Sequence, residues 1–400
     1  MIHMEVAMST TAFIRIAPAA GMFVLSVVGA MDLMDGISAS EASAQAAQTK
    51  SDFSAVARYV FIPSRGAAMV TVVDRNSDAV VGMLDPGRAP EHVVVSEATS
   101  KLAAVDGVAR GVSVVDLANG RRTAIDLDFT PRRLIGSPDG NMVAAVDLSA
   151  GSVAFIELMR TRVASQVTGL SSIRDLMFGP DGALFYLAAE RLNGIGVVDV
   201  ARGKLIDEIS IPSLRSSDSA SLTRSPSGRM GYVKARGSGT ISLVDLSNFR
   251  PVRELEVGRQ ADKAFPTGFG GYLVVPDNAE KTVTIIANAS LTVAAMLKGA
   301  PGMSTVYSGW FDTLALVPSA AERKLLVYDL DRLSQAADIP LPGTPGPGAV
   351  TPDGAKLYLA LEDAGKVGVI DLQSRKLVRT IATASNPVAA IMAKSFDVCH

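Results

Sequence analysis

The feature that most constrains the fold is a short apolar run that recurs eight times along the chain. "VSVVD" (112–116), "IGVVD" (195–199) and "VGVID" (367–371) are three clear copies. The intervals between the last residues of successive copies are 42, 41, 42, 46, 42, 42 and 42 residues. A period in the low forties is typical of a propeller blade of four short β-strands. The eight last residues are Asp74, Asp116, Glu157, Asp199, Asp245, Ala287, Asp329 and Asp371.

Each repeat divides into four strand-like runs. A first run such as "HVVVS" (92–96) is followed by a turn such as "SPDG" (137–140), and then by a second run such as "LAAV" (102–105). Proline, aspartate and glycine each suit one position of such a turn. The run that ends in aspartate is the third, and we expect that aspartate to cap the next turn through its side chain, which is a structural role.

The two ends of the repeat region predict how the ring closes. The region opens on a run of the second type, "YVFI" (59–62), and finishes on a run of the first type, "PVAAIM" (387–392). The last run would then complete the first blade, a velcro closure that leaves no free sheet edge between the termini. The sequence therefore predicts an all-β fold, an eight-bladed propeller of four-stranded antiparallel blades. The alternative is a seven-bladed ring with one stray copy of the run.

The N-terminus has the pattern of an export signal. Arg15 precedes an apolar run (17–31), and an A-x-A site follows at 42–44. An uncleaved anchor is the alternative, although the run is shorter than the roughly 20 residues of a membrane span. We expect a periplasmic protein with no stable span once the signal is removed. The predicted segments are a signal peptide (1–44), a linker (45–57), the propeller (58–394) and a C-terminal tail (395–400).

Charge and cysteine content exclude some classes. The chain has 38 basic and 40 acidic residues, a formal net charge of −2, so its overall charge does not indicate a nucleic-acid-binding protein. Cys399 is the single cysteine, so an intrachain disulfide cannot form.

The copies "VSVVDLANG", "IGVVDVARG" and "VGVIDLQS", with "SPDG"-like turns before them, resemble the YVTN-type propeller repeat. With eight blades, the architecture is similar to the cytochrome-d1-like propellers, which include the haem d1 domain of nitrite reductase and periplasmic propellers that help to make that haem. Periplasmic zinc-chaperone propellers are similar too. Eight-bladed PQQ alcohol dehydrogenases carry a docking tryptophan in each blade, whereas Trp310 is the only tryptophan here. The resemblance implies the fold but not the function, because this repeat serves many functions.

The loops that lead into the first strands of the blades should form the mouth of the central channel, where ligand sites are common. Five consecutive loops of this kind carry arginine, and the other three, "GAPGMS", "PGTPGPG" and "TASNP", are neutral. Arginine suits forked hydrogen bonds to carboxylates and phosphates, so the pattern predicts an anionic ligand, such as a carboxylate-rich tetrapyrrole, or the acidic patch of a partner. The alternative is that these cations pair with Glu91, Asp175, Asp218 and Asp262. The candidate ligand-binding residues are Arg88, His92, Arg132, Arg133, Arg174, Arg215, Arg259 and Lys263.

His92 is the only histidine in the predicted propeller. Its candidate roles are axial haem ligand, proton carrier or plain strand-start residue. Propellers that assemble haem d1 have a histidine in a comparable place, so the resemblance favours a functional role without selecting one. The chain has no CxxCH motif, so no covalent c-type haem is expected. We assign no metal site, although Cys399 and His400 could bind a soft metal, and we assign no catalytic residue because no nucleophile motif stands out.

These observations favour an exported, non-catalytic propeller that binds an anionic small molecule or a periplasmic partner protein at an arginine-lined mouth. Such a protein would act as a carrier, chaperone or scaffold in redox or cofactor metabolism, and no nucleic acid is expected as a partner. The alternative is a maturation factor or enzyme for haem d1 or another tetrapyrrole that uses His92. The cofactor is unknown from the sequence, with a tetrapyrrole as one candidate.

Overall fold

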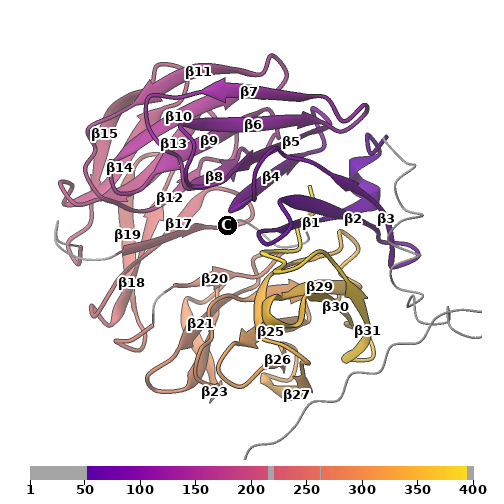
Figure 1. Cartoon of the computed structure of the whole chain (residues 1–400). Coiled ribbons are helices and arrows are strands. Elements are labelled where there is room, and N and C mark those ends of the chain that lie inside the picture. Colours follow the sequence, from indigo (N-terminus) through magenta and orange to yellow (C-terminus); the bar gives the residue numbers. More distant parts are fainter. Residues whose placement is uncertain (1–51, 215–219, 262, 394–400) are drawn as a thin grey trace, which may run out of the picture. The chain divides into compact units, whose positions relative to one another are not determined.

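The structure is a computed structural model that describes residues 52–214, 220–261 and 263–393. The predicted signal peptide (1–44), Arg215 and the C-terminal tail (395–400) lie outside these residues. Within the unit that spans Ala44–His400, eight antiparallel β-sheets follow one another as the blades of a propeller (Figure 1). Seven sheets have four strands and the first has three, so the predicted eight-bladed fold is confirmed and the seven-bladed alternative is wrong.

The first four blades cover residues 59–210. A short 3-10 helix, Val56–Arg58, precedes blade 1. The strands of blades 1 and 2 are β1 (Tyr59–Ser64), β2 (Met69–Asp74), β3 (Ala79–Leu84), β4 (His92–Ser96), β5 (Lys101–Val105), β6 (Gly111–Asp116) and β7 (Arg122–Asp126). Those of blades 3 and 4 are β8 (Arg133–Gly136), β9 (Met142–Asp147), β10 (Ser152–Glu157), β11 (Arg162–Val167), β12 (Ile173–Phe178), β13 (Leu184–Ala189), β14 (Gly194–Asp199) and β15 (Lys204–Ser210).

The last four blades cover residues 220–382. The strands of blades 5 and 6 are β16 (Ala220–Arg224), β17 (Met230–Ala235), β18 (Thr240–Asp245), β19 (Arg250–Glu256), β20 (Phe265–Pro266), β21 (Tyr272–Asp277), β22 (Thr282–Ala287) and β23 (Thr292–Lys298). Those of blades 7 and 8 are β24 (Tyr307–Gly309), β25 (Leu314–Ser319), β26 (Lys324–Asp329), β27 (Ser334–Pro340), β28 (Pro345–Val350), β29 (Lys356–Leu361), β30 (Lys366–Asp371) and β31 (Lys376–Ala382). A second 3-10 helix, Glu362–Ala364, follows β29.

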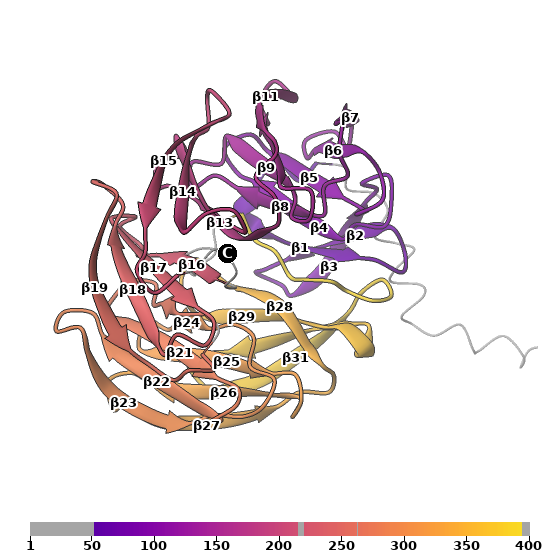
Figure 2. The same cartoon turned by 90° about the vertical axis from the view of Figure 1, so that its left-hand side faces the viewer.

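The core lies between the blades. The two middle strands of blades 4 and 5 are almost wholly buried, whereas the outer strands β15 and β19 of the same blades expose all but one residue each. Figure 2 shows β15, β19, β23 and β27 one after another along the rim. Phe155, Phe178 and Phe185 meet edge to face between blades 3 and 4, with ring centroids 4.9–6.1 Å apart. Burial of such apolar faces on both sides of each sheet is the main source of stability in this architecture.

The repeated aspartate has the structural role that the sequence predicts. Each of the eight predicted last residues is the last residue of a strand, from Asp74 in β2 to Asp371 in β30. The carboxylates of Asp74, Asp116, Asp199, Asp245, Asp329 and Asp371 accept hydrogen bonds from backbone N–H groups two or three residues further on. The recurrence of aspartate therefore reflects turn geometry rather than a binding function.

The C-terminal segment contacts the first blade. Phe61 of β1 forms a bridge with Ile391, and the two residues exchange backbone hydrogen bonds of 2.8 and 2.9 Å. A second bridge joins Ser64 to Pro387. The contacts between 387–391 and β1 are isolated bridges rather than a continuous strand, so the predicted velcro closure by a full fourth strand is not shown and stays a prediction.

Blades 8 and 1 are also joined by side chains at their seam. Lys356 Nζ lies 2.8 Å from Asp78 Oδ2, and the Tyr358 hydroxyl donates to the same carboxylate. Burial, with the neighbouring Asp78 carboxylate, raises the pKa of Tyr358. Before blade 1, Phe53 and Val56 are buried in the same core cluster as Tyr59, so packing against the propeller begins ahead of residue 58. Over the residues that the structure describes, no helix is long and apolar enough to cross a membrane.

Candidate functional site

The loops of the propeller lie at two ends, and the strand order determines at which end each loop lies. Neighbouring strands in every blade are antiparallel, so the loops between second and third strands lie at the same end as the loops that lead into the next blade. We call this the mouth end. The turns between first and second strands and between third and fourth strands lie at the opposite end. The seven predicted ligand-binding residues that the structure describes belong to loops or to the first residues of strands at the mouth end.

Asp175 is the centre of the predicted site. Asp175 lies near the start of β12 in blade 4, and the residue is only 6% exposed. Arg133, the first residue of β8 in blade 3, places Nη1 3.4 Å from Oδ1, and Lys263, ahead of β20 in blade 6, places Nζ 3.1 Å from Oδ2. The backbone N–H of Leu222 in blade 5 donates to Oδ2 at 2.8 Å. One carboxylate therefore joins the inner strands and their entry loops from four consecutive blades.

Arg174 lies on a β-bulge beside this carboxylate. The register of β12 against β13 shifts between Ile173 and Asp175, which leaves Arg174 as the extra residue. Bulges redirect a side chain out of the regular alternation of a strand. The Arg174 Nε atom is buried, and no hydrogen-bond acceptor among the described residues satisfies it. A buried guanidinium nitrogen in this state is costly unless something else provides the acceptor.

The described part of the cluster has more positive than negative charge. Arg133, Arg174 and Lys263 are three cations, and Asp175 is the one carboxylate that contacts two of them. Asp218 and Asp262, two expected acidic partners, lie outside the described residues, as does Arg215. The alternative from the sequence is that these cations pair with nearby acidic residues. Among the described groups, it holds for Arg133 and Lys263, which both pair with Asp175.

Arg88, Arg132 and Arg259 are more exposed than the residues around Asp175. Arg88 Nη1 lies 3.5 Å from Asp106 Oδ2 rather than at the expected partner Glu91. Burial by itself raises the pKa of Asp106, but the backbone N–H groups of Ala109 and Val108 and the Arg88 guanidinium outweigh it and hold this pKa below its ordinary value.

His92 is the partly buried first residue of β4, as predicted. The remaining candidate ligand-binding residues, Arg132 and Arg259, have exposed side chains.

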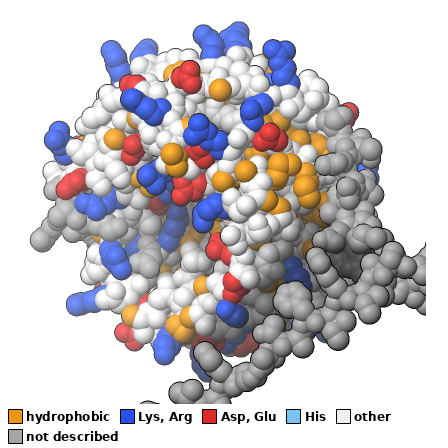
Figure 3. Space-filling view, viewed as in Figure 1, with side chains coloured by type: hydrophobic (Ala, Val, Ile, Leu, Met, Phe, Trp, Pro, Cys, Tyr) orange, Lys and Arg blue, Asp and Glu red, His pale blue; other side chains and the backbone are white. Residues whose placement is uncertain are grey.

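The three neutral entry loops predict a neutral wall on their side of the mouth, and this prediction is wrong because loops of another kind lie there too. The loops between second and third strands add charged groups there, among them Arg65, Glu362 and Asp363. Figure 3 shows basic and acidic side chains scattered among one another on the displayed face, with no continuous basic patch. These charged residues could have been assigned to the mouth end from the sequence, because their loops follow the second runs of the repeats.

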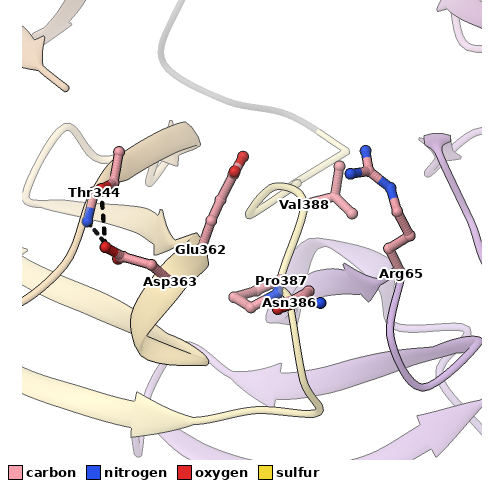
Figure 4. Close-up of a pocket in the computed structure, with 7 residues that line it drawn as sticks. All are labelled: Arg65, Thr344, Glu362, Asp363, Asn386, Pro387 and Val388. Atoms are coloured by element: carbon pink, nitrogen blue, oxygen red, sulfur yellow. Dashed lines mark hydrogen bonds between the residues drawn. The ribbon is translucent and has the colours of Figure 1, made fainter.

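A cavity of about 310 Å³ lies at this wall, between blades 8 and 1. Figure 4 shows Glu362 and Arg65 on opposite sides of it, both pointing toward the same space. Asp363 accepts hydrogen bonds from Thr344 N and Oγ1 at 2.7 and 3.0 Å. These bonds and the Arg323 guanidinium hold the pKa of Asp363 below its usual value. Glu362 and Arg65 have no ion-pair partner among the described residues, whereas Asp363 is paired with Arg323, so this cavity offers one unpaired charge of each sign.

The described residues include no cluster of three or more histidine, cysteine, aspartate or glutamate side chains that could hold a metal ion. A second cavity, of about 320 Å³, lies at the opposite end and is lined by Trp310 and Arg375 among others. His92 lines neither cavity.

The eight consecutive sheets define an eight-bladed β-propeller, and the residues around Asp175 form a cluster of charged side chains at its mouth end. Among solved structures, the chain is similar to the dihydro-heme d1 dehydrogenase NirN in complex with DHE, with a TM-score of 0.70 and 14% identity over 86% of this chain and 77% of that chain. It is also similar to AztD from Citrobacter koseri (TM-score 0.61, 15% identity, 84% of this chain and 98% of that chain). Kuenenia stuttgartiensis hydrazine synthase is a third (TM-score 0.54, 19% identity, 70% and 95%).

No protein-family model matches the chain, and no curated protein is similar to it in sequence. At 14–19% identity the similar structures establish the fold alone. The predicted resemblance to the cytochrome-d1-like propellers is confirmed at that level.

Proposed function

We propose that this protein is a non-catalytic binding propeller whose mouth takes an anionic ligand or the acidic patch of a partner protein. The observation that supports the proposal is the grouping of Arg133, Arg174 and Lys263 around the single carboxylate of Asp175, with the buried Arg174 Nε unsatisfied among the described residues. Because these groups are partly buried, such a surplus attracts negative charge more strongly than it would on an open surface. Arg132 and Arg88, which are more exposed, would guide the anion inward.

We also propose that the chain is exported to the periplasm and acts there as a carrier, chaperone or scaffold. The basis is the N-terminal pattern of Arg15, an apolar run and an A-x-A site. A mass spectrum of the mature N-terminus, measured on protein from a periplasmic extract, tests this part of the proposal.

The double substitution Arg132→Glu with Arg174→Glu is expected to weaken anion binding at least about tenfold, because two favourable charges become repulsive. The measurement is isothermal titration with a tetracarboxylate porphyrin and, separately, with citrate. Binding to the wild-type chain should also weaken as salt increases, because ions screen the attraction.

The matched control is Arg121→Glu with Arg250→Glu, which makes the same change in net charge with two exposed residues at the opposite end. This control should bind the probes as the wild type does. Equal losses in both double variants would mean that only net charge matters, and unchanged binding in the mouth variant would exclude this site.

A second candidate function is the handling of haem d1 or another tetrapyrrole with His92. The supporting observations are the place of His92 at the start of an inner strand and the similar fold of a haem d1 dehydrogenase in complex with DHE. The donor types fit a tetrapyrrole, with arginines for its carboxylates and an imidazole for its metal. The fit is incomplete, because neither cavity near 310–320 Å³ is lined by His92.

In this second candidate, His92→Ala should remove or shift the visible absorbance band of a bound metallotetrapyrrole, because an axial ligand sets the electronic state of the metal. The measurement is a spectroscopic titration with haem. Glu91→Gln, at the adjacent position, is the control and should leave the band unchanged. An identical band in His92→Ala would contradict a ligand role for His92.

A further inference from the structure

The turn between β24 and β25 differs from its counterparts in other blades. The turns of the "SPDG" type place a glycine in the left-handed region, as at Gly140 (φ 74°) and Gly354 (φ 68°). In blade 7 the sequence "GWFDT" occupies this place, and three consecutive residues other than glycine have positive φ: Trp310 (50°), Phe311 (58°) and Asp312 (65°). Bulky side chains rarely adopt this conformation, and strained residues of this kind cluster at functional sites.

Neighbouring blades hold the turn in this conformation. The Asp312 carboxylate accepts hydrogen bonds from the backbone N–H groups of Gly268 (2.7 Å) and Phe269 (3.1 Å) in the corresponding turn of blade 6. On the other side, Trp310 N donates to Gly354 O of blade 8 at 2.7 Å. The turn is thus fixed at both sides, so the aromatic side chains are presented in a defined position.

Burial does not compensate for the strain at Phe311. Its side chain is 65% exposed, and Phe269 on the adjacent turn is 69% exposed. The rings of Trp310 and Phe311 meet edge to face with their centroids 5.5 Å apart. An unfavourable backbone conformation thus holds aromatic side chains in contact with solvent. This combination points to contact with another molecule.

Two arginines flank this aromatic surface. A cavity of about 320 Å³ is lined by Trp310, Phe311, Thr313, Asp329, Asp331, Arg332 and Arg375. The nearly buried Asp329 carboxylate lies 3.0 Å from Arg332 Nη1 and 3.3 Å from Arg375 Nη2. It fixes both guanidinium groups beside the rings, while the Arg332 side chain stays 76% exposed, with donors available to a ligand.

We propose that this aromatic–arginine surface at the opposite end is the docking site for a peptide segment of a partner protein. The segment would place an aromatic or large aliphatic side chain against Trp310 and Phe311, and a nearby carboxylate against Arg332 and Arg375. Tryptophan and arginine are the residues most enriched among those that dominate protein–protein binding. A cavity of this volume is at the lower limit for small-molecule pockets and accommodates one or two side chains.

A second copy of this chain is the occupant that the test has to distinguish from a peptide segment. A two-fold contact through this surface would bring the same patch of both copies together. The turns that form this aromatic–arginine surface join first to second strands and third to fourth strands. They therefore lie at the end of the blades opposite the mouth end. The proposal is therefore independent of the anion site at the mouth.

The test is a selection of phage-displayed linear 12-residue peptides on the purified chain, with the Phe311→Asn variant in solution as a competitor. We expect enriched peptides to carry a large apolar residue within two positions of aspartate or glutamate. By fluorescence anisotropy, an enriched peptide should bind Phe311→Asn at least about tenfold more weakly than the wild type. Arg332→Gln should weaken it by a similar factor and reduce its salt dependence.

Phe311→Asn separates binding from folding. Asparagine tolerates positive φ better than phenylalanine, so the melting temperature should stay the same or rise by about 1–2 °C while binding is lost. The matched control is Met296→Asn, which removes an equally exposed side chain (65%) from outer strand β23 and should leave peptide binding unchanged.

Three outcomes would overturn the proposal. The first is that no peptide is enriched over the competitor, or that the enriched peptides are basic. The second is a fall in the melting temperature of Phe311→Asn, which would make the aromatic turn a structural element. The third is concentration-dependent dimerisation of the wild type that Phe311→Asn abolishes, because the occupant would then be a second copy.

Discussion

A chain that ends at Asn386 is expected to lose most of its stability and to aggregate when it is expressed. The missing residues 387–393 pair with β1 through bridges at Ile391 and Pro387, and Ala390 N also donates to Pro347 O of blade 8 at 3.0 Å. Met392 and Ala390 are buried in a core cluster that contains residues of blades 1 and 8. Truncation therefore removes the contacts of one segment with two blades.

The expected loss is large because several effects act together. Removal of one buried methionine side chain from a core typically costs about 2–5 kcal/mol, against a total stability of about 5–15 kcal/mol for a native domain. Val60, Phe61 and Ile62 of β1 are fully buried in the intact chain, and part of this surface would become accessible. The unpaired edge of β1 would also be available to other chains, which favours aggregation.

The measurement is urea unfolding followed by circular dichroism, with a chain that ends at Ala393 as the control. The control keeps each of the described contacts and should unfold at the urea concentration of the full chain. A synthetic peptide of residues 384–393, added to the truncated chain, should restore part of the stability, because ligand binding favours the native state. If the truncated chain unfolds like the control, the C-terminal segment does not close the ring.

The repeat allows most of the fold to be predicted, because one strand pattern is written eight times. The last residue of every third strand, from Asp74 to Asp371, was predicted at the observed residue. His92 was likewise placed at the start of an inner strand. Such local features follow from turn chemistry and from apolar runs, both of which are visible in a short window of sequence.

The contacts between blades could not be predicted in this way. Asp175 and Lys263 are 88 residues apart and belong to blades 4 and 6, so their ion pair depends on the curvature of the ring rather than on any local signal. Arg88 was expected to pair with Glu91, yet it lies beside Asp106, because two loops of one blade converge at the mouth. The aromatic turn did have a sequence signal: "GWFD" stands where other blades have "SPDG".

Asp175→Ala is expected to destabilise the chain by about 3 kcal/mol, which is at the lower end of the cost of removing one partner from a buried ion pair. Arg133 and Lys263 would lose the carboxylate that offsets their charge, and the Leu222 N–H would lose its acceptor. Both cations keep about a quarter of their side chains in contact with solvent, which limits the cost. The measurement is again urea unfolding.

The matched control is Asp207→Ala on outer strand β15, where an exposed carboxylate is removed; its stability should change by less than about 0.5 kcal/mol. A result as small for Asp175→Ala would mean that the carboxylate does not hold the four blades together.

The same variant also probes the mouth as an anion site. The space left by the Asp175 carboxylate would be bordered by Arg133, Lys263 and the Leu222 N–H, a donor set that suits a small carboxylate. Formate at tens of millimolar should therefore restore part of the lost stability of Asp175→Ala, through binding to the native state alone, and should have no such effect on Asp207→Ala. Sodium chloride at the same ionic strength separates this rescue from general screening. Rescue by formate and not by chloride would show that the cations of the mouth keep their arrangement without their own carboxylate, which is the property that binding of an external anion requires.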